Sequence, residues 1–253
     1  MTGLRYVYAV CRPLGAPLQA ELTGVAGAPA KQLNHHGLVA VVSEVPERDF
    51  AEEPLRAHLE DLDWLAATAR AHQGVIDALT VVTTPLPLRL ATVFRDDSAV
   101  RTMIEAREDH IRHTLDRLEG RVEWGVKIYA ETEQPQQAAQ PVPKAASGRD
   151  YLRQRRQQTR AGEDLWQKAE TFATRLHEQL SAFAEESRLH APQHPALSGG
   201  TAGRNVLNAA YLVPRGDSEE FVELVDRTKD DVPGLRVELT GPWAAYSFAG
   251  EEA

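Results

Sequence analysis

Residues 239–248 read LTGPWAAYSF and place a glycine–proline break between two short runs that are typical of strands. Charged and apolar residues alternate over 236–239, as they do in a half-buried strand. Pro242 has no amide hydrogen for a β-ladder, so it belongs at a bend, a bulge or a sheet edge. We therefore expect two strands to meet at this break, with Trp243 packed in the core of a C-terminal domain.

Length and charge set the class of protein. The chain has 253 residues, which suits one large domain or two small ones, and its net charge is −9. An acidic chain of this kind disfavours nucleic acid as a partner, because nucleic-acid-binding domains are basic. No window approaches the run of about 18 apolar residues that spans a bilayer. We expect a cytoplasmic protein with neither nucleic acid nor membrane as its partner.

Strand and helix patterns alternate along the whole chain. Apolar runs predict strands at 4–11, 38–45, 88–94, 122–129 and 206–213, followed by the final pair. Periodic apolar positions predict a long helix over Leu55–Leu79, a second after Asp96, a third from Tyr151 to Leu189 and an acidic helix ending near Asp230. The order β-β-α-β-α followed by β-α-β-α-β-β favours an α+β fold.

Two domains follow from this order, each a small mixed or antiparallel sheet covered by helices on one face. We place the boundary at Gly120, giving domains 1–120 and 121–253, with a ferredoxin-like plan for the second. Residues 132–148 contain no aromatic residue, and we interpret them as a flexible insertion in the second domain.

Motifs that carry chemistry are missing from the sequence. It contains no phosphate-binding P-loop, no G-x-G-x-x-G and no G-x-S-x-G. The glycine-rich stretch 199–203 precedes a strand and not a helix, so it is interpreted as a loop. Cys11, the one cysteine, lies in an apolar run and is expected to be a buried thiol. We expect no catalytic, cofactor-binding or metal-binding residues, and no cofactor.

The histidines have structural interpretations. His110 and His113 have the i, i+3 spacing of a metal pair, with Glu105, Glu108 and Asp109 nearby, but they occupy the polar face of their helix. His35-His36 precedes Gly37 and indicates a turn. His58 and His72 lie near the apolar stripe of the first long helix, where a partly buried, hydrogen-bonded imidazole is expected.

Charged clusters also have simple interpretations. The pairs Glu52-Glu53 and Glu219-Glu220 mark helix starts, where negative charge meets the helix dipole favourably. Five arginines share the start of the third long helix: Arg149, Arg153, Arg155, Arg156 and Arg160. A solvated helix face is the simplest interpretation, and a docking face for an acidic protein surface is the alternative.

Five segments in register give the chain a family resemblance. They are 6–8 (YVY), 87–94 (PLRLATVF), 123–127 (EWGVK), 148–152 (GRDYL) and 239–243 (LTGPW). Together they resemble the gas vesicle protein F/L family (GvpF/GvpL) from Leu4 to Phe248. Two residue pairs depart from the family pattern, which usually has Phe-Gly at Leu90-Ala91 and often has prolines at Ala244-Ala245.

The resemblance implies a non-enzymatic accessory or minor component of gas vesicles. It implies a protein that binds the small hydrophobic shell protein, limits its aggregation and assists assembly, with other gas vesicle proteins as further partners. Residues 1–120 are the candidate for shell-protein binding, through a sheet edge or a groove beside the helix Leu55–Leu79. A general protein-binding adaptor without catalytic activity is the alternative.

The interpretation of residues 132–148 can be tested directly. Replacing them with a Gly/Ser linker of equal length should change the free energy of unfolding by less than about 1 kcal/mol, because loop closure depends weakly on composition. Urea unfolding measures the difference, and a larger loss would show that the segment packs on the fold.

Overall fold

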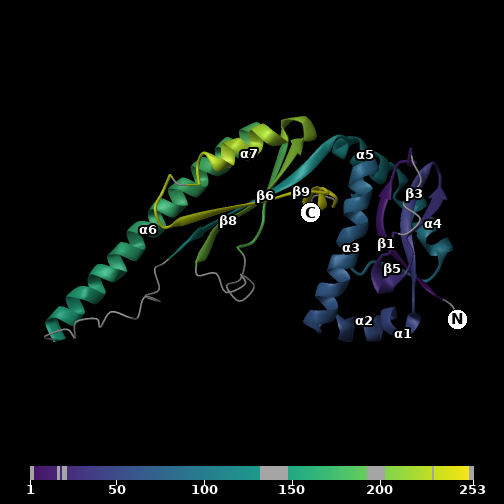
Figure 1. Cartoon of the computed structure of the whole chain (residues 1–253), viewed down its shortest axis with the longest axis horizontal. Helices are drawn as coiled ribbons and strands as arrows, with labels where there is room; N and C mark the ends of the chain where they lie inside the picture. Colours follow the sequence, from purple (N-terminus) through teal and green to yellow (C-terminus); the bar gives the residue numbers. More distant parts are fainter. Residues whose placement is uncertain are drawn as a thin grey trace. The chain divides into compact units, whose positions relative to one another are not determined.

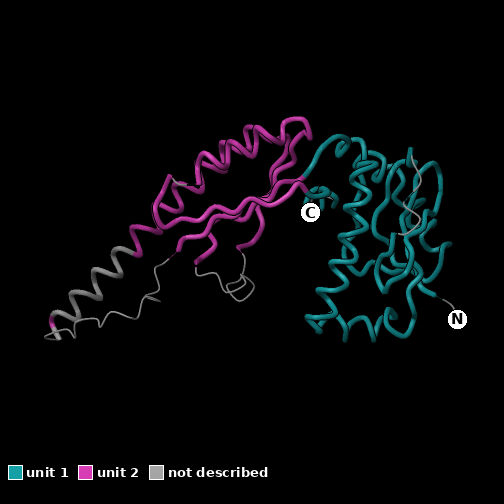
Figure 2. Tube along the Cα trace, viewed as in Figure 1, with its two compact units in different colours: residues 1–122, 243–253 teal, residues 123–242 magenta. Residues whose placement is uncertain are grey.

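The computed structural model describes residues 3–15, 18, 22–131, 148–192, 203–229 and 231–250, with the backbone alone for 148 and 150–161. The chain forms two compact units (Figure 2). Unit 1 consists of residues 1–122 and 243–253, and unit 2 of residues 123–242. The structure is mixed α+β with two sheets, which confirms the predicted fold class.

Unit 1 is built on an antiparallel sheet (Figure 1). Its strands are β1 (Leu4–Cys11), β2 (Lys31–His35), β3 (Leu38–Val45), β4 (Leu86–Pro87) and β5 (Val93–Phe94). The order is β2-β3-β1-β4, and β5 also pairs with β1. The helices are α1 (Glu47–Phe50), α2 (Glu52–His58), α3 (Leu62–Val82), α4 (Asp97–Ala106) and α5 (Glu108–Leu118), with short 3-10 turns at Val25–Gly27 and Tyr246–Phe248.

Both faces of the unit 1 sheet are buried, whereas one covered face was expected. The last six residues of β1 are all buried, and so are seven of the eight residues of β3. Figure 1 shows α3 on one side of β1 and β3 and α4 on the other. Strands buried on both faces carry near-continuous apolar runs, as residues 38–45 do.

Unit 2 has the ferredoxin-like plan that the sequence predicts. Its elements are β6 (Arg121–Ala130), α6 (Gly148–Phe183), β7 (Glu186–Leu189), β8 (Arg204–Pro214), α7 (Ser218–Asp226) and β9 (Leu235–Trp243), with a 3-10 turn at Arg215–Asp217. The βαββαβ chain order and the strand order β7-β8-β6-β9 define that topology. Figure 1 shows α6 and α7 on one face of this sheet.

Two predicted helices are each broken, and one predicted strand is shorter than expected. The helix expected over Leu55–Leu79 ends at His58 and begins again at Leu62, because the Asp61 carboxylate accepts hydrogen bonds from the amides of Asp63 (3.0 Å) and Trp64 (3.2 Å). The helix after Asp96 is interrupted at Arg107. Of the strand expected at 88–94, only residues 93–94 form a strand (β5), and β4 lies just before the predicted range.

The sequence did not predict two edge strands, β2 and β7. The helix expected through Leu189 ends at Phe183, and the Glu185 amide then donates to the Leu212 carbonyl of β8 at 3.0 Å. Pairing with β8 therefore overrides the helical propensity of residues 184–189. In unit 1, β2 pairs with β3 through a two-residue turn at His36-Gly37, which confirms the expected turn.

Trp243 does not pack in the core of unit 2, and this prediction is wrong. Its side chain is 40% exposed. Gly241 has a φ of +126°, and a Cβ at this position would lie 2.8 Å from the Glu123 carbonyl oxygen. β9 ends at Trp243, and Phe248 in the 3-10 turn that follows is fully buried, within unit 1. Residues 243–253 therefore group with unit 1, whereas the predicted domain 121–253 placed them with unit 2.

The core of unit 1 contains a polar network around His72. The Tyr6 hydroxyl contacts His72 Nδ1 at 3.0 Å and accepts a hydrogen bond from the Ala91 amide at 3.0 Å. His72 is 3% exposed, which confirms the expected buried histidine. Burial lowers the pKa of His72 to about 4, because the imidazolium form loses its hydration.

His72 should make the stability of unit 1 depend on pH. The unfolded imidazole has a pKa near 6.5, so between about pH 6.5 and pH 4 the unfolded chain binds more protons and the folded state loses stability as pH falls. We expect a loss of about 2 kcal/mol from pH 7 to pH 5. Urea unfolding at both pH values should show that His72→Gln removes this loss, while His113→Gln at an exposed site keeps it. Equal pH dependence in both variants would contradict the assignment.

Ala91 has a strained backbone conformation in unit 1. Its φ is +62°, in the left-handed region that costs an L-residue about 1–2 kcal/mol. Glycine adopts this conformation freely, which explains the Phe-Gly of the family pattern at Leu90-Ala91. Ala91→Gly should therefore raise the free energy of unfolding by about 0.5–1 kcal/mol, after subtraction of the entropy that glycine adds to the unfolded chain.

Urea denaturation measures this gain, and Ala67→Gly on the exposed side of α3 is the matched control. The control should lose about 1 kcal/mol, the usual cost of glycine inside a helix. Destabilisation by Ala91→Gly would show that the turn carries no strain.

Candidate functional site

Cys11 is not a reactive thiol. Its side chain is buried in β1, and its sulfur donates to the Val39 carbonyl oxygen at 3.6 Å. Burial raises the pKa of this thiol to about 12, so the nucleophilic thiolate is scarce at neutral pH. The expected structural role of Cys11 is confirmed.

A serine–histidine contact lies on α6 of unit 2, but it lacks the geometry of a catalytic pair. Ser181 Oγ is 3.4 Å from His177 Nδ1, and it donates to Ser187 Oγ at 3.0 Å. The same His177 nitrogen contacts the Tyr211 hydroxyl at the shorter distance of 2.8 Å. The imidazole therefore orders a core tyrosine and does not activate the serine.

Exposed apolar side chains gather at the two ends of α3 in unit 1. At its start, Leu62 is 76% exposed, and Leu59 is partly exposed just before it. At its end, Val81 is 85% exposed, with Val82 beside it. In unit 2, Leu189 at the end of β7 is 64% exposed. Such side chains favour contact with an apolar partner where they lie together.

The edge strand β2 presents a more polar surface. Lys31, Gln32 and Asn34 are exposed, and Leu33 is buried. A lysine on an edge strand discourages pairing with another chain. Of the two contact elements expected in the N-terminal domain, the surroundings of α3 therefore fit an apolar partner better than the β2 edge.

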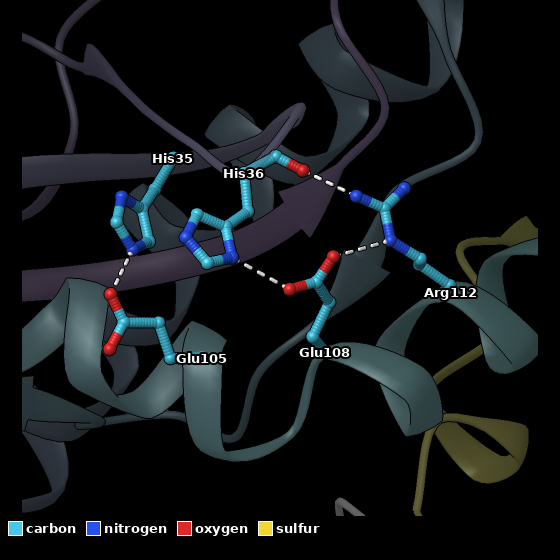
Figure 3. A network of polar contacts seen from close by, with 5 residues as sticks. All are labelled: His35, His36, Glu105, Glu108 and Arg112. Atoms are coloured by element: carbon cyan, nitrogen blue, oxygen red, sulfur yellow. Dashed lines mark hydrogen bonds and ion pairs between the residues drawn. The ribbon is translucent and has the colours of Figure 1, made fainter.

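A polar network joins the β2–β3 turn to α4 and α5 (Figure 3). His35 Nε2 lies 2.6 Å from Glu105 Oε1, and His36 Nδ1 lies 2.7 Å from Glu108 Oε2. Arg112 donates from Nε to Glu108 Oε1 at 2.9 Å and from Nη2 to the His36 carbonyl oxygen. The hydrogen bonds from His36 and Arg112 lower the pKa of Glu108, so this side chain is a carboxylate at neutral pH.

In the structure, Glu105 and Glu108 contact other histidines than His110 and His113, the two that lie near them in the sequence. Glu105 contacts His35 and Glu108 contacts His36, both at the β2–β3 turn. Among the residues that the structure describes, the cluster of three metal-ligand side chains is His35, His36 and Glu105. No spacing in the sequence signals this cluster, because 70 residues separate His35 from Glu105.

The glutamate pairs lie where the sequence predicts them, and most of the arginine cluster lies outside the described side chains. Glu52-Glu53 and Glu219-Glu220 lie in the first turns of α2 and α7, as expected. Arg149 is exposed at the start of α6, whereas the side chains of Arg153, Arg155, Arg156 and Arg160 lie outside the described residues, as do 132–147 and 199–202. No helix in the described ranges has the length and apolar content needed to span a bilayer.

A groove of about 460 Å³ lies against α6 in unit 2. Its lining includes Lys168, Phe172 and Arg175. Arg175 already lies over the Phe172 ring at 5.7 Å and contacts Asp231 at 3.4 Å. Arg175 therefore has partners within the fold, and the described lining of the groove shows no convergent set of reactive side chains.

Comparison with known proteins agrees with the resemblance. The family model described as "Gas vesicle synthesis protein GvpL/GvpF" matches residues 4–250. The chain is 56% identical over 250 residues to gas vesicle protein L of Streptomyces sp. (strain CB03234), covering 98% of this chain and 93% of the relative. It is 26% identical to gas vesicle protein F of the same strain, covering 96% and 98%.

Two solved structures share the fold. The crystal structure of GvpF from Anabaena sp. PCC7120 has a TM-score of 0.72 at 19% identity and covers 99% of this chain and 98% of that one. The structure of GvpF from Microcystis aeruginosa has a TM-score of 0.68 at 20% identity and covers 99% and 100%. With the full-length family match and the 56% identical relative, these findings show that the chain belongs to the gas vesicle protein GvpL/GvpF family.

Proposed function

We propose that this protein binds the gas vesicle shell protein in the cytoplasm, limits its aggregation and assists its assembly, without catalysing a reaction. The observation that supports this most is membership of the family over residues 4–250. The N-terminal domain, predicted at 1–120, is the proposed binding domain.

The physical reason for such a role is exposed apolar surface. A subunit that will form a hydrophobic wall carries large apolar patches before assembly, and such patches aggregate. A bound protein of net charge −9 covers part of this surface and keeps the complex in solution by charge repulsion. This role needs a contact surface and no reactive site.

We place the contact surface at the two ends of α3. Leu62 and Val81 are the most exposed of the large apolar side chains that the structure describes. Both lie in unit 1 and within the proposed binding domain 1–120. Burying either side chain against an apolar partner would add about 1.5–3 kcal/mol of favourable transfer free energy.

Coexpression with the shell protein tests the proposal. The full chain should raise the amount of soluble shell protein, and the double variant Leu62→Ser/Val81→Ser should lower that amount about fivefold or more, as expected when anchoring contacts worth over ~1 kcal/mol are lost. Leu189→Ser is the control, because it removes a largely exposed apolar side chain from unit 2. Circular dichroism should show that all three proteins are folded.

Three results would count against the proposal. If the full chain neither raises soluble shell protein nor forms a complex with it at low salt, the proposed function fails. If Leu189→Ser is the variant that loses binding, the contact lies in unit 2. Stable binding to a different gas vesicle protein, without binding to the shell protein, would favour the adaptor alternative.

A further inference from the structure

We infer that the β2–β3 turn and the end of α4 form a binding site for a divalent transition-metal cation of the Zn²⁺ class, with His35, His36 and Glu105 as its ligands. This site is independent of the proposed contact with the shell protein. The bound cation would link two segments of unit 1, the β2–β3 turn and α4.

The donor set and its spacing suit Zn²⁺. One ligand atom from each of His35, His36 and Glu105 lies within 4.8 Å of the other two. Zinc binds imidazole nitrogen and carboxylate oxygen at about 2.0–2.2 Å, so ligand atoms this close can reach one ion after small movements. Two imidazoles and a carboxylate leave a fourth position for water, which is a common zinc coordination.

Glu108 orients the His36 ring for this role. A carboxylate only accepts hydrogen bonds, so His36 Nδ1 carries the hydrogen at the 2.7 Å contact with Glu108. The lone pair is then on Nε2, and Figure 3 shows this second ring nitrogen directed toward the side of His35 and Glu105. Metal-binding histidines usually donate their other N–H to a carboxylate in this way, and Arg112 holds Glu108 in place at 2.9 Å.

The turn at position 36 has a left-handed backbone. His36 and Gly37 have φ values of +49° and +70°, the pattern of a two-residue type I′ turn. Asn-Gly is the pair that this turn prefers, and histidine is also among the residues enriched at left-handed positions. An asparagine at position 36 would therefore keep the turn and remove the imidazole.

Cation binding requires a modest change of the rings. The His35 and His36 rings now stack, with centroids 4.3 Å apart and planes at 22°. Their nitrogens converge on one ion when the rings rotate about their second side-chain torsion, which has a broad energy minimum. His35 Nε2 now contacts Glu105, so a cation would take the place of this contact.

Zinc titration of the tag-free full chain, after treatment with EDTA, tests the site. Calorimetry should show one saturable Zn²⁺ per chain, and thermal unfolding should show a higher midpoint with Zn²⁺, because the ion binds the folded state. Co²⁺ in place of Zn²⁺ should give the visible absorption of a nitrogen- and oxygen-ligated ion.

Three variants distinguish the site from adventitious binding. His36→Asn keeps a favoured Asn-Gly turn and should fold normally but lose both the binding and the Zn²⁺-induced shift. Glu108→Gln retains all three ligands and should weaken binding about 10- to 100-fold. His113→Asn, which changes an exposed histidine of α5, should bind Zn²⁺ like the wild type.

The inference is overturned if the wild-type chain shows no saturable Zn²⁺ binding. It is also overturned if folded His36→Asn binds Zn²⁺ with unchanged affinity and stoichiometry, which would place the ion on other residues. Soluble shell protein in the coexpression assay should be the same with His36→Asn as with the wild type, so failure of one proposal leaves the other standing.

Discussion

Two buried tyrosine hydroxyls on β1 hold the irregular segments of unit 1 in place. The Tyr8 hydroxyl accepts from the Val25 amide at 2.8 Å and donates to Ser43 Oγ at 2.9 Å. The Tyr6 hydroxyl accepts from the Ala91 amide. A buried amide without a partner costs about 1–3 kcal/mol, so each hydroxyl determines where a non-regular segment can lie. The register of β1 and β3 shifts between Val7 and Ala9, and this irregularity lets both tyrosines and Cys11 join one core cluster.

The two units bury their sheets differently, and the difference follows from the sequence. In unit 1 the central strands are apolar along their length and have helices on both faces. In unit 2, β6 carries Trp124, Val126 and Ile128 at alternate positions, and all three are buried. The sheet of unit 2 is covered by α6, on which Ala169, Phe172, Leu176 and Leu180 are buried, whereas Leu165 and Phe183 of the same apolar stripe are partly buried.

Elements with a strong apolar pattern could be predicted from the sequence, whereas the interruptions within helices could not. The bounds of β1 and β3 agree with the predicted 4–11 and 38–45 because apolar runs define both strands. The break between α2 and α3 depends on one capping carboxylate, Asp61, within a pattern that otherwise continues as a helix. The contact between His35 and Glu105 depends on the packing of β2 beside α4, and β2 was not predicted. A local pattern cannot predict such a site before the sheet order is known.

The segments that carry the family resemblance mostly serve the fold. Gly241 allows β9 to approach the Glu123 carbonyl closely, Ala91 occupies a left-handed turn position, and Tyr6 and Tyr8 anchor the core. None of these positions offers a partner a large exposed surface. The exposed apolar side chains at the ends of α3 and the charged network at the β2–β3 turn lie outside the five segments. The segments that carry the resemblance therefore explain the architecture, whereas the contact surface and the cation site that we propose consist of residues that only the folded surface brings together.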